Sequence, residues 1–187
     1  MTDAGNPTDT VAGIESLGSL RIDCYIRSNI SRVSDRQVEA ILERLRSLSE
    51  AGLVADYQTR QWPPKRHAVV ESQAAETTRG ELLAKFEGWA DQRGYSLKPA
   101  FQRRMVPGSL VGADEPREEV RVPIVTLALY DESTETEPLT GVVPYTDEYD
   151  TDERRTYTID AWLSALEDRT RQSTGPVTQP SPAADGD

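Results

Sequence analysis

Strand-like alternation opens the folded part of the chain. Every second position in residues 20–26 is apolar, namely Leu20, Ile22, Cys24 and Ile26. A period of two is typical of a strand with one apolar face. Residues 120–130 (VRVPIVTLALY) are almost continuously apolar and predict a central strand that is buried on both faces. Three shorter segments also favour strands: 53–62, 101–105 and 139–145, the last as a hairpin partner of 120–130.

Three other segments show the 3.6-residue period of amphipathic helices. In the first, Ser34 and Gln37 have capping-box spacing, and Gly52 is a suitable stop. We therefore expect a helix from Ser34 to about Ala51. Its apolar stripe comprises Val38, Ile41, Leu42, Leu45 and Leu48.

The second and third helices also have start signals. Thr78 and Glu81 repeat the capping-box spacing, and Gly94 ends the helix that follows. Its apolar face comprises Leu82, Leu83, Phe86, Trp89 and Ala90. Thr158 caps the last helix, whose apolar side comprises Ile159, Trp162, Leu163 and Leu166.

The element order predicts the fold class. A strand, a helix and a strand indicate a parallel βαβ unit, and the later strands form an antiparallel hairpin with a closing helix. This is the order of an α/β, thioredoxin-like fold, β-α-β-α-β-β-α with a mixed sheet. Pro123 stands where that fold places a cis-proline. A ferredoxin-like α+β sandwich and a winged helix are the alternatives.

Both ends of the chain have the composition of disordered segments. Residues 1–18 are polar and residues 170–187 are rich in Pro, Ser, Thr and Gln, so neither can offset its ordering entropy by apolar burial. We expect one α/β domain at 19–169, with an acidic insert at 131–153. No signal peptide pattern and no apolar run near the ~18 residues of a membrane span appear, which favours a cytoplasmic protein without a membrane partner.

The charge is uneven along the chain. Asp and Glu number 32 against 21 Lys and Arg, for a net charge of -11, and only Lys65, Lys85 and Lys98 are lysines. Scarce lysine and many carboxylates are typical of a halophilic protein from a salty cytoplasm. The acids gather in residues 1–18, 133–153 and 172–187, which contain no Lys or Arg. The remainder is near neutral, with basic islands at 60–66 and 98–104, so an anionic partner is not excluded.

The residues that most enzymes need are missing. A single Cys and a single His leave no disulfide, no Cys-x-x-Cys pair and few zinc sites. A redox thioredoxin-like protein needs a thiol at the start of its first helix, but residues 28–32 (SNISR) have none. No nucleophile elbow, phosphate-binding loop or EF-hand spacing appears. We therefore expect neither catalysis nor a cofactor or metal.

One segment favours a nucleic-acid partner. Residues 36–66 resemble the back half of a winged helix, with Arg44 and Arg46 toward a groove and Arg60, Lys65 and Arg66 toward phosphates. The two basic islands add Trp62, Arg103 and Arg104 as candidate binding residues. In a winged helix, two further helices precede the recognition helix in the sequence, whereas here a strand is predicted at that place.

Five stretches carry a family resemblance: 25–28 (YIRS), 37–54, 85–104 (KFEGWADQRGYSLKPAFQRR), 122–130 and 156–167 (TYTIDAWLSALE). Together they are similar to uncharacterised haloarchaeal proteins labelled "HTH domain protein". The resemblance implies DNA binding and transcriptional regulation, and it brings no catalytic residues. The chain departs from the family's pattern in its long acidic insert after Tyr130.

The sequence thus favours a non-catalytic regulatory or adaptor protein that acts by binding a protein or a small ligand. A DNA-binding transcriptional regulator with a winged-helix-like segment at 36–66 is the alternative. Pairing of 20–26 with 120–130 would exclude the winged helix. The oligomeric state, the partner and the pathway stay open.

Overall fold

A computed structural model describes residues 11–13, 17–28, 30–63, 78–106, 117–136, 138–148 and 154–173. Within these ranges the chain forms three helices: α1 (Arg32–Glu50), α2 (Arg79–Arg93) and α3 (Ile159–Ser173). The strands in the same ranges are β1 (Leu20–Ile26), β2 (Asp56–Gln61), β3 (Tyr95–Ser96), β4 (Gln102–Val106), β5 (Arg117–Arg121), β6 (Val125–Asp131), β7 (Leu139–Val143), β8 (Tyr145–Asp147) and β9 (Arg155–Tyr157).

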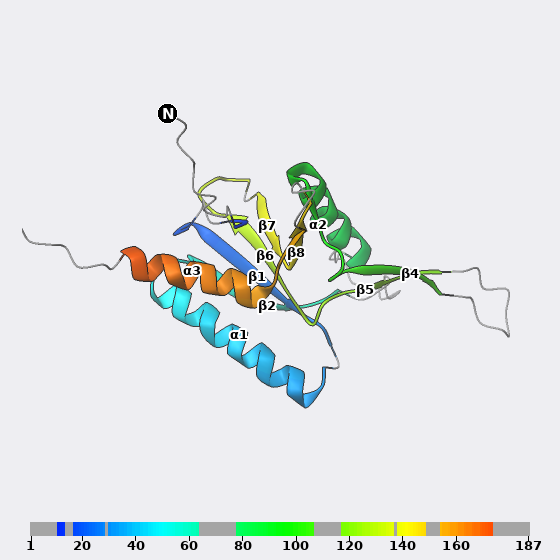
Figure 1. Ribbon diagram of the computed structural model, residues 1–187, viewed down its shortest axis with the longest axis horizontal. Helices are drawn as coiled ribbons and strands as arrows, with labels where there is room; N and C mark the ends of the chain where they lie inside the picture. The colour runs from blue at the N-terminus through cyan, green and yellow to red at the C-terminus, as the bar shows by residue number, and fades with distance from the viewer. Residues whose placement is uncertain are drawn as a thin grey trace, which may run out of the picture.

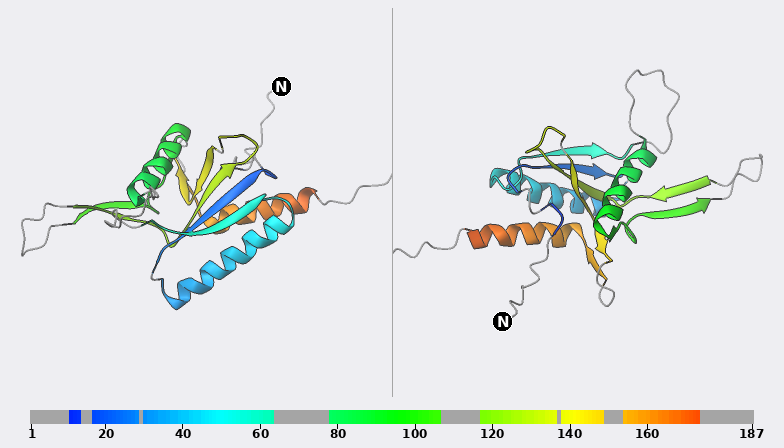
Figure 2. Two further views of the ribbon diagram at one scale, coloured as in Figure 1. Left: turned by 180° about the vertical axis from the view of Figure 1, so that it is seen from behind. Right: turned by 90° about the horizontal axis from the view of Figure 1, so that it is seen from above.

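Four strands form a central mixed sheet in the order β2-β1-β6-β7. β1 is parallel to β2 and antiparallel to β6, and β7 is antiparallel to β6. α1 and α3 lie side by side on one face of this sheet, and α2 covers the other face (Figures 1 and 2). The predicted α/β class, the parallel first unit and the antiparallel hairpin are confirmed.

The strand pairing also decides between the alternative folds. A ferredoxin-like chain has two strands between its helices, whereas β2 is the only strand that the described residues between α1 and α2 form. Leu20 to Ile26 pair with Asp131 to Val125, so the predicted pairing of the first and central strands is present and a winged helix is excluded. The predicted mixed sheet is confirmed, whereas the described chain has three further strands, β3 to β5, between α2 and the central strand β6.

The predicted strand 120–130 is in fact two strands. β5 ends at Arg121 and β6 starts at Val125, with Pro123 between them. A proline has no N–H to donate to a ladder, so β5 leaves the sheet and pairs with β4 instead. Among the described residues the cis bonds precede Pro99 and Pro144, so the expected cis bond at Pro123 is wrong.

The predicted start of α1 is also wrong. Ser31 is the N-cap, and its Oγ accepts a hydrogen bond from the Ser34 backbone N–H at 3.3 Å. Ser34 therefore lies in the first turn, because two serines three residues apart both fit the capping signal and the earlier one is used. The stop is confirmed, since Gly52 has a left-handed φ of 73°.

The start of α2 follows the prediction. Glu81 N–H donates to Thr78 Oγ1 at 3.2 Å, and Thr78 N–H donates to Glu81 Oε2 at 2.7 Å. The reciprocal bonds complete the predicted capping box. All five residues of its predicted apolar face are buried.

Both faces of β1 are buried. Leu20, Ile22 and Cys24 face α1 and α3 and are fully inaccessible. On the opposite face the Tyr25 ring lies 5.9 Å from the Phe86 ring of α2, and Asp23 is only 4% exposed. The sequence predicted one apolar face for this strand, whereas both faces of β1 are covered by other parts of the protein.

Residues 11–13, which composition assigned to a disordered tail, pack into the core. Val11 is 3% exposed. The Ala12 N–H donates to the Tyr145 hydroxyl at 3.1 Å, and Trp162 Nε1 donates to the Ala12 carbonyl at 2.9 Å. These contacts span more than 130 residues in sequence, so local composition could not indicate them. The region expected as an acidic insert likewise contains β7 and β8.

Candidate functional site

Arg44, expected to face a DNA groove, joins α1 to α3. Its Nε lies 2.7 Å from Glu167 Oε1, and its Nη1 lies 3.2 Å from Asp160 Oδ1. Nη2 also donates to Ser164 Oγ at 3.0 Å. The guanidinium is thus held between two helices.

Arg46 stays at the surface of α1. It pairs with Glu43 one turn earlier at 2.8 Å, and its side chain is 56% exposed. A hydrogen bond with Tyr57 raises the pKa of Arg46. This face of α1 alternates basic and acidic side chains, so it presents little net positive charge to an anionic partner.

Arg60 and Trp62 lie on the α2 side of the sheet and have structural partners. Arg60 Nε lies 3.0 Å from Asp23 Oδ2, and Arg21 Nη1 lies 3.0 Å from Asp23 Oδ1. The buried carboxylate is therefore neutralised by two arginines. Trp62 is 4% exposed and packs in the core, with its ring tilted against Tyr25 and edge-on to Phe86 and Phe101. Lys65 and Arg66 lie outside the described residues.

Arg103 and Arg104 lie on β4, in a two-stranded antiparallel ribbon with β5. The ribbon projects away from the body of the protein, on the side of α2 (Figures 1 and 2). Arg103 lies opposite Val120, and Arg104 lies opposite Glu119. The six candidates that lie within the described residues therefore do not form one site: of these six, only Arg103 and Arg104 lie on a projecting element.

The two faces of the ribbon differ in chemistry. Side chains directly opposite in an antiparallel ladder share a face, so Arg104, Glu119, Gln102 and Arg121 lie together. Arg103, Met105 and Val120 lie on the other face. Arg104 Nε is 2.9 Å from Glu119 Oε2, while the exposed Arg121 forms no ion pair within the described part of the chain.

The second face of the ribbon is anchored to the body. Arg103 Nε donates to Glu87 of α2 at 3.0 Å, which fixes the root of β4 against the helix. Met105, farther along β4, is 64% exposed. The described side chains of the ribbon include three arginines and one glutamate, so this element is positively charged on an acidic protein.

Sequence reasoning missed Arg121. The run 120–130 predicted one buried strand, and Arg121 inside that run was therefore not counted among the candidate binding residues.

The described residues offer little for a metal or a nucleophile. They contain no cluster of three or more His, Cys, Asp or Glu arranged to hold a metal ion. Cys24 is fully buried in β1, and burial raises the pKa of its thiol to about 12. Such a thiol stays protonated and is a poor nucleophile. None of the described helices is both long and apolar enough to cross a membrane.

Comparison with known proteins gives one match. A family model described as a helix-turn-helix domain matches residues 14–171. No curated protein and no solved structure matches. In the described part of the chain, however, strands separate each helix from the next, so no two helices are joined by a tight turn. The match covers the whole α/β unit rather than a helix pair.

Proposed function

The chain belongs to this helix-turn-helix domain family, and on that premise we propose that it is a non-catalytic, DNA-binding regulator that contacts DNA through the β4–β5 ribbon. The supporting observation is the projecting, arginine-bearing ribbon (Figure 1). Family membership favours DNA as the partner, and the fold indicates which element can reach it.

The shape of the ribbon suits a DNA groove. The major groove admits an α-helix or a two-stranded β-ribbon. α1 cannot enter it easily, because its apolar stripe packs on the sheet and Arg44 is tied to α3. β4 and β5, by contrast, pair only with each other among the described strands, and the face that carries Arg104 and Arg121 is not the one anchored to α2 through Arg103.

The charge of the ribbon suits phosphates. Arg104 and Arg121 share one face, on which Glu119 is the acidic neighbour. The Arg104 side chain is 68% exposed, and ion pairs at such exposure contribute little, so Arg104 can exchange Glu119 for a phosphate at low cost. The exposed Met105 on the other face is a suitable apolar contact for a base or a sugar.

The test compares two double variants that each remove two positive charges. One is Arg104→Ala with Arg121→Ala on the ribbon, and the other is Arg36→Ala with Arg46→Ala on the exposed face of α1. Binding to a mixed-sequence DNA duplex would be followed by fluorescence anisotropy across a salt series. Each lost phosphate contact should reduce the slope of log K against log salt by about 0.9.

We expect the ribbon variant to bind DNA more weakly, with a salt slope shallower by about 1.8 if both arginines contact phosphates. The α1 variant should bind like the wild type. If the α1 variant loses binding instead, the interface is the segment 36–66 and the ribbon proposal fails. If the wild-type protein binds no DNA at any salt concentration, DNA is not its partner.

A further inference from the structure

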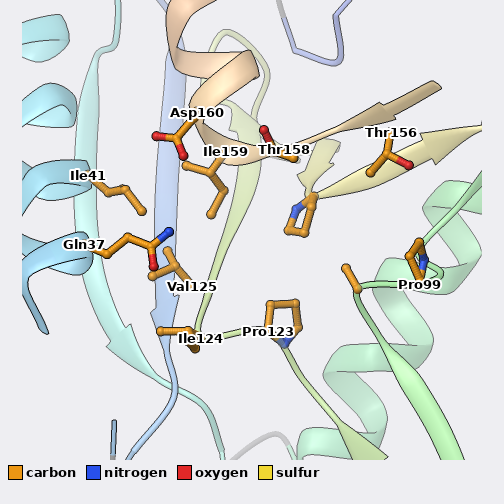
Figure 3. Close-up of a pocket in the computed structure, with 12 residues that line it drawn as sticks. Gln37, Ile41, Pro99, Pro123, Ile124, Val125, Thr156, Thr158, Ile159 and Asp160 are labelled. Atoms are coloured by element: carbon orange, nitrogen blue, oxygen red, sulfur yellow. The ribbon is translucent and has the colours of Figure 1, made fainter. Parts of the chain in front are cut away.

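A pocket of about 440 Å³ opens where α1, α3 and the start of β6 meet. Its volume falls within the range of small-molecule sites. Figure 3 shows Gln37 and Ile41 of α1 on one side, Pro99 on the opposite side and Ile159 and Asp160 of α3 above. None of the six predicted binding residues that the structure describes lines it.

The pocket exists because proline-containing breaks prevent the strands from closing over it. Pro123 separates β5 from β6, and Pro144 separates β7 from β8. Pro99 and Ala100 precede β4. The rings of these prolines line the pocket. Because a proline nitrogen has no N–H to donate, the hydrogen-bond ladder of the sheet cannot extend into the pocket.

The pocket lies at the root of the ribbon. Pro99 and Ala100 stand one residue before β4, which starts at Gln102, and Pro123 and Ile124 stand one residue after β5, which ends at Arg121. Both strands of the ribbon therefore leave the body from the pocket wall. A molecule that fills the pocket would contact both attachment points of the ribbon.

The polar side chains of the pocket are Gln37, Thr156, Thr158 and Asp160, and Asp160 is the only charged residue among those that line the pocket. The Gln amide and the Thr hydroxyls can donate or accept a hydrogen bond, whereas the ionised Asp160 carboxylate only accepts. Most other lining side chains are aliphatic or proline rings. This combination fits an apolar body with a donor group, and it disfavours a carboxylate or phosphate, because no basic side chain lines the pocket.

We propose that this pocket binds a small amine with an apolar body, and that the bound amine alters DNA binding by the ribbon. The first part is independent of the proposed function, whereas the second part rests on it. The ammonium group lies against the Asp160 carboxylate, and the apolar body contacts Ile41, Ile124 and the prolines.

Asp160 can accept the amine without disrupting the helix pair. Arg44 Nη1 contacts Asp160 Oδ1 at 3.2 Å, but the shorter contact, at 2.7 Å, joins Arg44 Nε to Glu167. Glu167 therefore holds Arg44 in place when Asp160 shares its charge with a ligand. The Asp160 side chain is 70% exposed, so it can reorient.

Three probes of one shape test the charge preference: phenethylamine, phenethyl alcohol and phenylacetate. Isothermal titration calorimetry on the full chain without DNA would measure each affinity, and amide NMR shifts would locate the site. We expect the amine to bind tightest, the alcohol more weakly and the carboxylate weakest. Asp160→Asn should weaken amine binding by about two- to fivefold, because an ion pair at this exposure contributes only modestly, and it should leave alcohol binding unchanged.

Asp168→Asn is the matched control, since it removes an exposed carboxylate of α3 that pairs with Arg171 and does not line the pocket. It should bind the amine like the wild type. Equal weakening in both variants would show that the overall acidic charge, not the pocket carboxylate, attracts the amine, and equal affinities for the three probes would overturn recognition by charge. Absence of binding by all three would overturn the pocket proposal.

The regulatory part is measured separately. Saturating phenethylamine should change the DNA affinity of the wild type by about fivefold or more, and at subsaturating concentrations its effect should be smaller in Asp160→Asn. Amine binding without any effect on DNA affinity would overturn the regulatory part alone. Amine binding by a protein that binds no DNA would overturn the proposed function and leave the pocket assignment intact.

Discussion

At Gly141, neighbouring side chains pack directly against the backbone and leave no room for a Cβ atom. A Cβ atom there would lie 2.6 Å from Leu129 Cδ1 and 3.1 Å from Ala12 Cβ. Leu129 is fully buried in β6, so it has little room to move. The absence of a side chain lets residues 11–13 pack over β7.

We predict that Gly141→Ala lowers the free energy of unfolding by about 1–3 kcal/mol, the usual cost of overpacking a core. Gly88→Ala is the control. Gly88 lies in α2, and a Cβ added there would meet open space, so the change should stabilise by about 0.5–1 kcal/mol through helix propensity. Urea denaturation measures both. If Gly141→Ala leaves the free energy of unfolding unchanged or raises it, Leu129 and Ala12 can move enough to accommodate the added methyl group.

Single residues in local motifs could be predicted from the sequence, and residues in long-range contacts could not. The capping box of Thr78 and Glu81 lies within one helical turn, so its spacing is visible. Arg60 looked free for phosphates because its partner, Asp23, is on another strand. The same holds for Arg44, whose acidic partners are more than 110 residues away.

At the scale of elements, the junction of α1 and α3 depends on Arg44. Its side chain is 27% exposed and contacts two carboxylates and a hydroxyl. Partial burial and several partners make this arrangement stronger than an isolated surface pair. The two helices otherwise meet through apolar side chains such as Leu45 and Leu166, which are almost fully buried.

We predict that Arg44→Met destabilises the protein by about 1 kcal/mol, and that Arg46→Met changes stability by less than about 0.5 kcal/mol. The comparison is matched, because both arginines lie on α1 and only Arg44 is ion-paired to another element. Chemical denaturation at low and high salt would measure both. Similar losses for the two variants would contradict a specific role of Arg44 at this junction.

Element types could be predicted well, and boundaries at prolines could not. Periodicity identified all three helices and the central sheet of the described chain, because burial on one side of an element is visible along the sequence. The run 120–130 contains Pro123, which marks the break, but the apolar residues on both sides of it predicted one continuous strand although they belong to two different sheets. The ribbon and the pocket at its root both result from that break.

At the scale of the whole molecule, one buried thiol and three buried phenols make the stability of the protein depend on pH in alkaline solution. Burial raises the pKa of the Cys24 thiol to about 12, and burial also raises the pKa of the Tyr25, Tyr130 and Tyr145 phenols. The ordinary pKa values are 9.0 for the thiol and 10.0 for the phenols. The folded protein therefore holds these protons to higher pH than the unfolded chain does.

We predict that stability is constant below pH 9.0 with respect to these groups, and that it falls as pH rises toward 12. Each group that ionises only in the unfolded chain lowers the free energy of unfolding by up to about 1.4 kcal/mol per pH unit. As pH rises, the loss of stability due to Cys24 should begin first, because its ordinary pKa is the lowest of the four.

Urea denaturation at pH 9.0 and pH 10.0 would measure the loss of stability in the wild type and in Cys24→Ala. The variant begins less stable, because it leaves a cavity in β1, but its decline over this interval should be smaller than that of the wild type. Equal declines would mean that the thiol ionises as readily in the folded protein as in the unfolded chain, which its complete burial between β2 and β6 opposes.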